Sequence, residues 1–372
     1  MTATLSDVLP AAAAALGVPL PDGDGRSAIE LPRADRVVVV LVDGLGEHLL
    51  AAVGSHAAHL NSMRHDAVLH SGFPSTTATS MGSFGTGLPP GAHGLVGYEV
   101  YDPARGRAFN ELSWDEGPDP RAWQPHRTVF EQVVAAGVPA AHIGPGYFEG
   151  SGLTVAALRG PTFISAGPLS ARVDAAVEQV RRNTRSLVYL YWGDVDRVGH
   201  ELGVASRAWL REVEAVDLAV RTLMRRLPAG TLVVVTADHG MVDVPFENRI
   251  DLADDTPVAR TLRDGVRVFA GEPRAPMLHT EPGTAAEVAA RWRDVLGDQA
   301  DVLLKAEVLE RGWFGPVEPR VVDRIGDVCV TMTAPTCVHD SRSQRRQLRQ
   351  LVGMHGSRTP AETAIPLLVA VV

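Results

Sequence analysis

The chain has 372 residues, of which 45% are hydrophobic and 21% are charged, as in an ordinary globular protein. This composition excludes collagen, coiled-coil and extensively disordered chains, and the net charge of -9 disfavours a nucleic-acid polymer as a partner. Cys329 and Cys337 are too few for a disulfide framework or a thiolate metal site, so we expect both to be reduced and buried.

The N-terminal segment lacks the basic start and the sustained apolar run of a signal peptide. The alanine cluster at residues 11–15 and the other apolar runs are too short to span a bilayer. We therefore expect a cytoplasmic protein without a membrane partner. The sequence carries no signal for a particular oligomeric state.

Apolar runs alternate along the chain with segments of helical periodicity, which is typical of a mostly parallel sheet covered by helices. The predicted strands are, in chain order, residues 36–42, 140–143, 186–192, 231–237, 266–270, 328–332 and 365–371. The predicted helices are residues 129–136, 171–183, 206–226 and 285–296. We therefore predict an α/β fold with helices on both faces of a central sheet. Residues 1–372 would form one domain, in which residues 245–335, rich in proline and glycine, form an irregular insertion or subdomain near the rim of the site.

Three of the predicted strands end at, or shortly before, the acidic residues Asp43, Asp196 and Asp238. Ligands of open parallel sheets bind beyond the carboxyl ends of the strands, so these side chains should converge on one rim. A single aspartate after a strand is usually a helix cap or a turn residue. Two of these three, however, have a histidine close by, His200 and His239. A mixed set of oxygen and nitrogen ligands suits zinc best and manganese second.

Residues 72–80 are rich in hydroxyl side chains and read Gly-Phe-Pro-Ser-Thr-Thr-Ala-Thr-Ser. They precede two further short motifs, Thr86-Gly87 and His93-Gly94. Serine and threonine are common helix caps, so the local sequence alone favours a polar loop before a helix. A functional interpretation places one hydroxyl at the N-terminus of that helix. Its amides and dipole would then stabilise an alkoxide and a bound phosphoryl oxygen. These residues alone leave open which threonine would act.

The order of these motifs resembles the alkaline phosphatase superfamily, and in particular its type I phosphodiesterase/nucleotide pyrophosphatase family. That family carries D-G, then P-[ST]-x-T with T-G nine residues on, H-G, D-x-x-G-H, D-H-G-M and a final H-G. The chain matches each motif in the same order, at residues 43–44, 74–77, 86–87, 93–94, 196–200, 238–241 and 355–356. The matches extend over almost the whole chain.

The resemblance implies two divalent metal ions, most plausibly zinc, with manganese as the alternative. One ion would be held by Asp196, His200 and His355, and the other by Asp43, Asp238, His239 and the Thr77 oxygen. Thr77 rather than Thr76 keeps the family's spacing from the proline and to Thr86-Gly87. Thr77 would therefore be the catalytic nucleophile and would carry a phosphothreonine intermediate.

The implied function is hydrolysis of a small-molecule phosphodiester or nucleotide pyrophosphate. In one place the chain departs from the family, because Tyr98 stands where an asparagine usually helps to bind the phosphoryl oxygen. This departure keeps phosphomonoesterase and phosphonate hydrolase activity open as alternatives. From another class, a non-catalytic metal-binding relative also remains open.

Other polar residues support weaker expectations. Arg274 and His279 are expected to face solvent, with a place in the substrate pocket as the alternative. Asp194 stands two residues before a predicted ligand and is a candidate for a supporting contact behind it. Glu362 precedes the last predicted strand and is expected to be structural.

Overall fold

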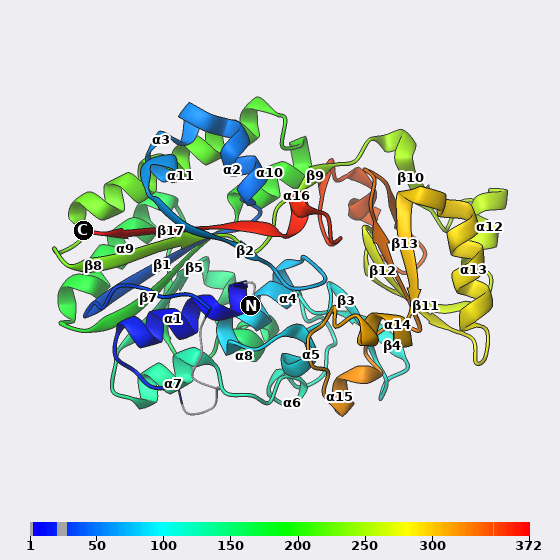
Figure 1. The fold of residues 1–372 in the computed structure, drawn as a ribbon, viewed down its shortest axis with the longest axis horizontal. Helices are drawn as coiled ribbons and strands as arrows, with labels where there is room; N and C mark the ends of the chain where they lie inside the picture. Colours follow the sequence, from blue (N-terminus) through cyan, green and yellow to red (C-terminus); the bar gives the residue numbers. More distant parts are fainter. Residues whose placement is uncertain (1–2, 21–27, 345) are drawn as a thin grey trace.

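The computed structural model describes residues 3–20, 28–344 and 346–372. Its largest element is a seven-stranded sheet in the order β2-β17-β8-β1-β7-β5-β6 (Figure 1). The strands β8, β1, β7, β5 and β6 are parallel, whereas β17 runs antiparallel to both of its neighbours, β8 and β2. The mostly parallel sheet predicted from the sequence is therefore confirmed. The bounds are β1 (Arg36–Val42), β2 (Arg64–His70), β5 (Ala140–Gly144), β6 (Thr162–Ser165), β7 (Ser186–Trp192), β8 (Thr231–Thr236) and β17 (Ala364–Val371).

Helices cover both faces of this sheet, as predicted (Figure 1). One group packs around α11, and the other packs around the helix that begins at Thr77, which is α4. The first group consists of α2 (Glu47–Val53), α3 (Ala58–Ser62), α9 (Leu169–Arg182), α10 (Asp194–Leu202) and α11 (Arg207–Arg226). The second consists of α1 (Val8–Ala15), α4 (Thr77–Thr86), α7 (Val129–Ala135) and α8 (Gly152–Ala157).

Local sequence explains the main elements. In β1 every residue after Arg36 is a buried valine or leucine, as expected for a strand covered on both faces. The helix α11 begins after Ser206, whose hydroxyl accepts a hydrogen bond from the backbone N–H of Trp209. Its buried residues recur every three to four positions, which places one apolar face against the sheet layer; they are Trp209, Val213, Val216, Val220 and Leu223.

A second sheet lies beyond the carboxyl ends of the central parallel strands (Figure 1). It has six strands in the order β13-β14-β12-β11-β3-β4. The helices α12 (Pro257–Arg263) and α13 (Ala285–Leu296) pack with it around the buried Trp292. Most of residues 245–335 therefore form a regular sheet with its own core, and the expectation of an irregular segment was wrong. The strands are β3 (Glu99–Asp102), β4 (Arg107–Asn110), β11 (Val266–Glu272), β12 (Ala275–Thr280), β13 (Ala300–Leu304) and β14 (Val328–Met332).

Shorter elements connect the two sheets. The short strands pair as two separate ladders, β10 with β15 and β16 with β9. Cys329 and Cys337 are free and buried, as expected. Within the described ranges, no helix is long and apolar enough to cross a bilayer. The short elements are α5 (Pro90–His93), α6 (Pro120–Trp123), α14 (Lys305–Glu310), α15 (Pro319–Val322), α16 (Pro360–Thr363), β9 (Val242–Asp243), β10 (Arg249–Asp251), β15 (Cys337–His339) and β16 (Gly353–Met354).

A buried ion pair joins the second sheet to the start of β17. Arg274, in the turn between β11 and β12, donates from Nε and Nη2 to the two carboxylate oxygens of Glu362 at 2.7 and 2.8 Å. Both side chains are at most 1% exposed. Glu362 also accepts from the Ser357 backbone N–H at 3.1 Å and from the Thr359 hydroxyl. Arg274 is therefore neither exposed to solvent nor part of the substrate pocket, whereas Glu362 is structural, as expected.

We expect Glu362→Ala to lower the free energy of unfolding by about 3–5 kcal/mol, because it leaves the Arg274 guanidinium buried without its partner. The matched control is Glu178→Ala, which breaks a pair with Arg182 whose side chains are 53% and 68% exposed. That change should cost less than about 1 kcal/mol. Urea unfolding of both variants measures the difference, and equal losses would contradict the structural role of the buried pair.

Candidate active site and metal centre

The predicted acidic residues lie at one edge of the central sheet. Asp43 directly follows β1, Asp238 follows β8, and Asp196 lies in the first turn of α10, after β7. These three strands are adjacent and parallel, so their carboxyl ends meet. The backbone N–H of Gly44 donates to Asp238 Oδ1 at 3.1 Å, which ties the ends of β1 and β8 together.

The glycine of the D-G motif allows the close approach of α10. Gly44 has a φ of +74°, in the left-handed region that favours glycine. A Cβ atom at this position would lie 3.0 Å from both Cα and Cβ of Asp196. Any larger residue here would therefore push α10, and with it Asp196, away from Asp43.

His239 stands at the centre of the acidic cluster. Its Nε2 atom lies 3.4 Å from Asp43 Oδ1, 3.5 Å from Asp238 Oδ2 and 3.3 Å from Thr77 Oγ1. Its Nδ1 atom is 3.0 Å from the carbonyl oxygen of Gly240. Because a carbonyl oxygen can only accept, Nδ1 carries the proton and the lone pair of Nε2 faces the cluster.

His200 and His355 are held in the same way. Their Nδ1 atoms donate to the carbonyl oxygens of Gly353 at 2.7 Å and of Ser75 at 2.8 Å. Their Nε2 atoms face each other at 3.2 Å, and Asp196 lies 3.4 Å from His200 and 3.8 Å from His355. With both Nδ1 atoms protonated, two lone pairs point at each other. A cation between them would replace this repulsion with coordination.

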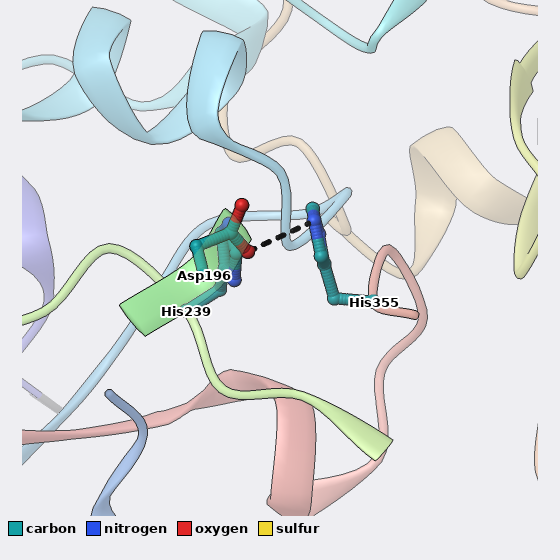
Figure 2. Close-up of side chains that lie close together, drawn as sticks. All are labelled: Asp196, His239 and His355. Carbon is teal, nitrogen blue, oxygen red and sulfur yellow. Dashed lines mark ion pairs between the residues drawn. The ribbon is translucent and has the colours of Figure 1, made fainter. Parts of the chain in front are cut away.

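The ligand atoms form two overlapping groups. One group comprises Asp43, Asp238 and His239, three of the residues that the family resemblance assigned to one ion together with Thr77. The other comprises Asp196, His239 and His355, and Figure 2 shows the Asp196 carboxylate pointing toward the His355 ring. The rings of His239 and His355 stack with centroids 3.6 Å apart, which keeps the two groups together. The family resemblance placed His200, and not His239, with Asp196 and His355; in the structure His200 contacts both of these residues.

The site is electrostatically unbalanced without a positive charge. Asp43 Oδ1, Asp196 Oδ1 and Asp238 Oδ2 are buried and have no hydrogen-bond partner among the described residues. Burial, assisted by neighbouring carboxylates, raises the pKa of Asp196 and of Asp238 to about 7 and that of Asp43 well above its usual value. Burial also lowers the pKa of His355 well below its usual value. These unpartnered acceptors fit bound metal cations, which would compensate the buried negative charge.

Thr77 is the first residue of α4, at the helix N-terminus, and Thr76 is its N-cap. The Ser80 hydroxyl donates to the carbonyl oxygen of Asp238 at 2.8 Å, which fixes this helix against the end of β8. The Ser75 hydroxyl donates to the carbonyl oxygen of Ser357 at 2.7 Å. The loop before Thr77 and the loop that carries His355 are therefore held as one unit.

The sequence did not identify Tyr191 as part of the site. This residue lies near the end of β7, and its hydroxyl donates to Asp43 Oδ2. Burial, followed by the charge of Asp43, raises the pKa of Tyr191 well above its usual value, so the hydroxyl remains a donor. The only available signal was its position near the end of the strand that leads to Asp196.

Three further residues from the sequence analysis lie outside the metal cluster. His279 is 3% exposed and stacks on Tyr101 with ring centroids 4.3 Å apart, so it does not face solvent. Asp194 pairs with Arg197 at 2.9 Å, and both residues line the pocket that also contains Thr77 and Asp43. The backbone N–H of Tyr98 donates to the buried Glu272 at 2.6 Å.

A pocket of about 460 Å³ opens beside Thr77 and Asp43. Its volume falls within the range typical of small-molecule sites, roughly 300–1,000 Å³. Its other lining residues include Phe148, Tyr191 and Arg172.

A family model described as type I phosphodiesterase/nucleotide pyrophosphatase matches residues 37–358. The chain belongs to this family. The match extends over most of the chain and includes every motif named above, so the family expected from the motif order is confirmed. The family is metal-dependent.

Two mouse proteins are similar to this chain. Mouse ectonucleotide pyrophosphatase/phosphodiesterase family member 3 is 24% identical over 221 residues, which cover 55% of this chain and 25% of that protein. The chain thus matches about a quarter of that relative's length. Murine ectonucleotide pyrophosphatase/phosphodiesterase 5, solved in an inactive form in complex with AMP, has a TM-score of 0.67 at 20% identity, covering 90% of this chain and 87% of that one.

A bacterial structure is equally similar in fold. Phosphonoacetate hydrolase from Sinorhizobium meliloti 1021, solved in complex with phosphonoformate, has a TM-score of 0.70 at 22% identity. The match covers 93% of this chain and 92% of that chain. Together these neighbours confirm the alkaline phosphatase-like α/β fold predicted from the sequence.

Proposed function

We propose that the chain is a metal-dependent phosphoester hydrolase that uses Thr77 as its nucleophile and two divalent cations. The observation that carries this proposal is the position of Thr77 Oγ1, which lies 3.3 Å from His239 Nε2 at the meeting point of the two ligand groups. A binding protein would need the ligand groups, but it would have no use for a hydroxyl at that point.

Asp43, Asp238, His239 and Thr77 would hold one cation, and Asp196, His200 and His355 would hold the other. The mixture of carboxylate and imidazole donors favours zinc, with manganese second. When bound, the cations lower the pKa of the attacking hydroxyl and offset the negative charge of the phosphoryl group. Tyr191 keeps Asp43 oriented through its hydrogen bond to Oδ2.

In the proposed reaction Thr77 Oγ1 loses its proton and attacks the phosphorus, while the bond to the leaving oxygen breaks and that oxygen takes up a proton. A phosphothreonine forms from a monoester, and its ester, which keeps the second substituent of the phosphorus, forms from a diester. Water then hydrolyses this ester and regenerates the hydroxyl. The N-terminal amides of α4 point toward the phosphoryl oxygens, because the first N–H groups of a helix have no partner within it. The hydrogen bond from Ser80 to the Asp238 carbonyl keeps that helix end in place during both steps.

Phosphodiesters or nucleotide pyrophosphates are the proposed substrates. The family description and the AMP complex of the murine neighbour support this class. The phosphonate complex of the bacterial neighbour supports phosphonate hydrolysis as the second candidate. Phosphomonoester hydrolysis is the third.

The test compares a diester, a monoester, a nucleotide pyrophosphate and a phosphonate with zinc and with manganese, and with a chelator as the control. We expect the diester bis-p-nitrophenyl phosphate to be hydrolysed faster than p-nitrophenyl phosphate, and all turnover to stop in the chelator. A protein that binds metal but hydrolyses none of the four would instead be the non-catalytic metal-binding relative.

A further inference from the structure

The active-site pocket contains a buried arginine that forms no direct ion pair. Arg172 lies in the first turn of α9 and is 6% exposed. It lines the same pocket of about 460 Å³ as Thr77 and Asp43. Among the described residues, no ion pair within 4.0 Å involves its guanidinium. The charge of Asp194, which itself pairs with Arg197, acts on Arg172 from a longer distance and offsets only part of the effect of burial, which lowers the pKa of Arg172. A buried charge without a directly paired counter-charge is costly, so its presence in this pocket requires a physical explanation.

The hydrogen bonds of Arg172 leave part of its guanidinium free. Nη1 donates to the carbonyl oxygen of Tyr191 at 2.6 Å, and Nε donates to that of Ala166 at 2.9 Å. The guanidinium lies over the Trp192 ring, 4.6 Å from its centroid. Arginine has five N–H donors, and these two bonds use two of them. One N–H of Nη1 and both N–H groups of Nη2 therefore remain. They can donate hydrogen bonds to a carboxylate or phosphate.

Arg172 is connected to the reaction centre through Tyr191. The Tyr191 carbonyl accepts from Arg172, and the Tyr191 hydroxyl donates to Asp43. From Tyr191 an aromatic wall continues to Phe148, with ring centroids 5.4 Å apart, and then to Tyr147, with centroids 4.8 Å apart. A flat group attached to the phosphoryl would pack along this wall and bring its far end within reach of Arg172.

The other basic groups of the pocket cannot take the same role. Burial lowers the pKa of His142 to about 3, so this pocket residue is neutral. Arg197 already pairs with Asp194 at 2.9 Å and with Glu201 at 3.2 Å. Among the described residues that line the pocket, Arg172 is thus the cation that forms no ion pair within 4.0 Å.

We propose that Arg172 determines specificity by binding an anionic group on the substrate, at a distance from the scissile phosphoryl. The class of substrate is then a phosphoester or phosphonate with a second negative charge, either a carboxylate or a phosphate. This inference rests on the proposed function, because it names the substrate class of the same site.

The test uses the metal-loaded protein and two p-nitrophenyl diesters of matched shape. The second ester group is p-nitrophenyl in one and 4-carboxyphenyl in the other, so the two probes differ mainly in charge. We expect kcat/KM to be about 10- to 100-fold higher for the carboxylate probe, the usual range for a hydrogen bond to a charged group. A third probe with a 4-phosphonophenyl group shows whether carboxylate or phosphate is preferred.

In Arg172→Gln the preference for the charged probes should fall to about onefold, whereas Arg172→Lys should retain part of it. The matched control is Arg182→Gln on the same helix, because its exposed side chain pairs with Glu178 outside the pocket. Arg182→Gln should keep the full preference. Since each preference is a ratio measured within one variant, a partial loss of folded protein does not change it.

Equal kcat/KM for the charged and uncharged diesters in the wild-type protein would overturn the role of Arg172 and leave the proposed function intact. The same holds if the preference survives in Arg172→Gln. If neither diester is hydrolysed, phosphodiester hydrolysis fails as the first candidate activity. Titration calorimetry with benzylphosphonate and 4-carboxybenzylphosphonate then decides, because equal affinities would overturn the anion site independently of turnover.

Discussion

Thr77→Ala is expected to reduce kcat/KM for bis-p-nitrophenyl phosphate by at least about a thousandfold, as removal of a nucleophile usually does. The alanine keeps the helix N-terminus and all six aspartate and histidine ligands but lacks the attacking oxygen. The variant should therefore fold and still bind metal. Kinetics, together with metal content measured by mass spectrometry, separates loss of the nucleophile from loss of the cations.

Thr76→Ala is the matched comparison, because it removes the same hydroxyl one residue earlier. Thr76 is the N-cap of α4, but its side chain makes no capping hydrogen bond. We expect this variant to retain most of its activity. A larger loss of activity in Thr76→Ala than in Thr77→Ala would show that Thr76 is the nucleophile. Full activity in both variants would exclude a threonine nucleophile at these two positions.

Asp238→Asn is expected to reduce activity at least a hundredfold, roughly the loss that follows when a buried charged ligand is removed. The same change should make the metal-free protein more stable at pH 8. Oδ1 of Asp238 accepts from the N–H groups of Gly44 and His239, and an asparagine oxygen can keep both bonds. Oδ2 has no partner, so the substitution removes a buried charge without breaking a hydrogen bond.

The pH dependence follows from the pKa of Asp238, which burial and then Asp196 raise from 3.8 to about 7. Between these two values the folded metal-free protein holds a proton that the unfolded chain has lost, so stability falls as the pH rises. Melting temperatures in EDTA should therefore drop between pH 4 and pH 7 for the wild-type protein, and less for Asp238→Asn. Asp255→Asn, at a side chain that is 85% exposed, is the control and should change neither curve. A melting temperature for Asp238→Asn below that of the wild-type protein, in EDTA at pH 8, would contradict the destabilising effect of the buried Asp238 charge.

The central fold was predictable because its strands are covered on both faces. The bounds of β1, β7, β14 and α13 agree with the sequence-based ranges, and the other predicted elements differ by at most two residues at an end. The edge strand β2 was missed for a physical reason. It reads Arg-His-Asp-Ala-Val-Leu-His and buries only Leu69 fully, so it has no continuous apolar run.

The second sheet could not be recognised from local patterns. Its strands β3 and β4 are four residues long and lie more than 150 residues before β11, with which β3 pairs at Gly271 and Glu99. Pairings over such separations are decided by tertiary packing rather than by local propensity. The proline- and glycine-rich turns between the later strands therefore resembled an irregular segment.

The candidate ligand residues were predicted from the resemblance in motif order, but their supporting contacts were not. The three histidines are oriented by the carbonyl oxygens of Gly240, Gly353 and Ser75. A backbone carbonyl has no signature in the sequence, because every residue carries one. The same limit applies to Arg172, whose place in the pocket depends on the packing of α9 against the end of β7.

The position of β17 has a consequence for biosynthesis. This strand lies inside the central sheet, between β8 and β2, although its residues, 364–371, follow those of every other strand in the chain. While the ribosome is still adding these residues, β8 lacks one neighbour and β2 lacks the strand with which it pairs. His355 emerges only shortly before, so a nascent chain cannot assemble the complete ligand set early. We therefore expect metal loading to follow the synthesis of residues 355–371 and to be a late step in the folding of this part of the chain.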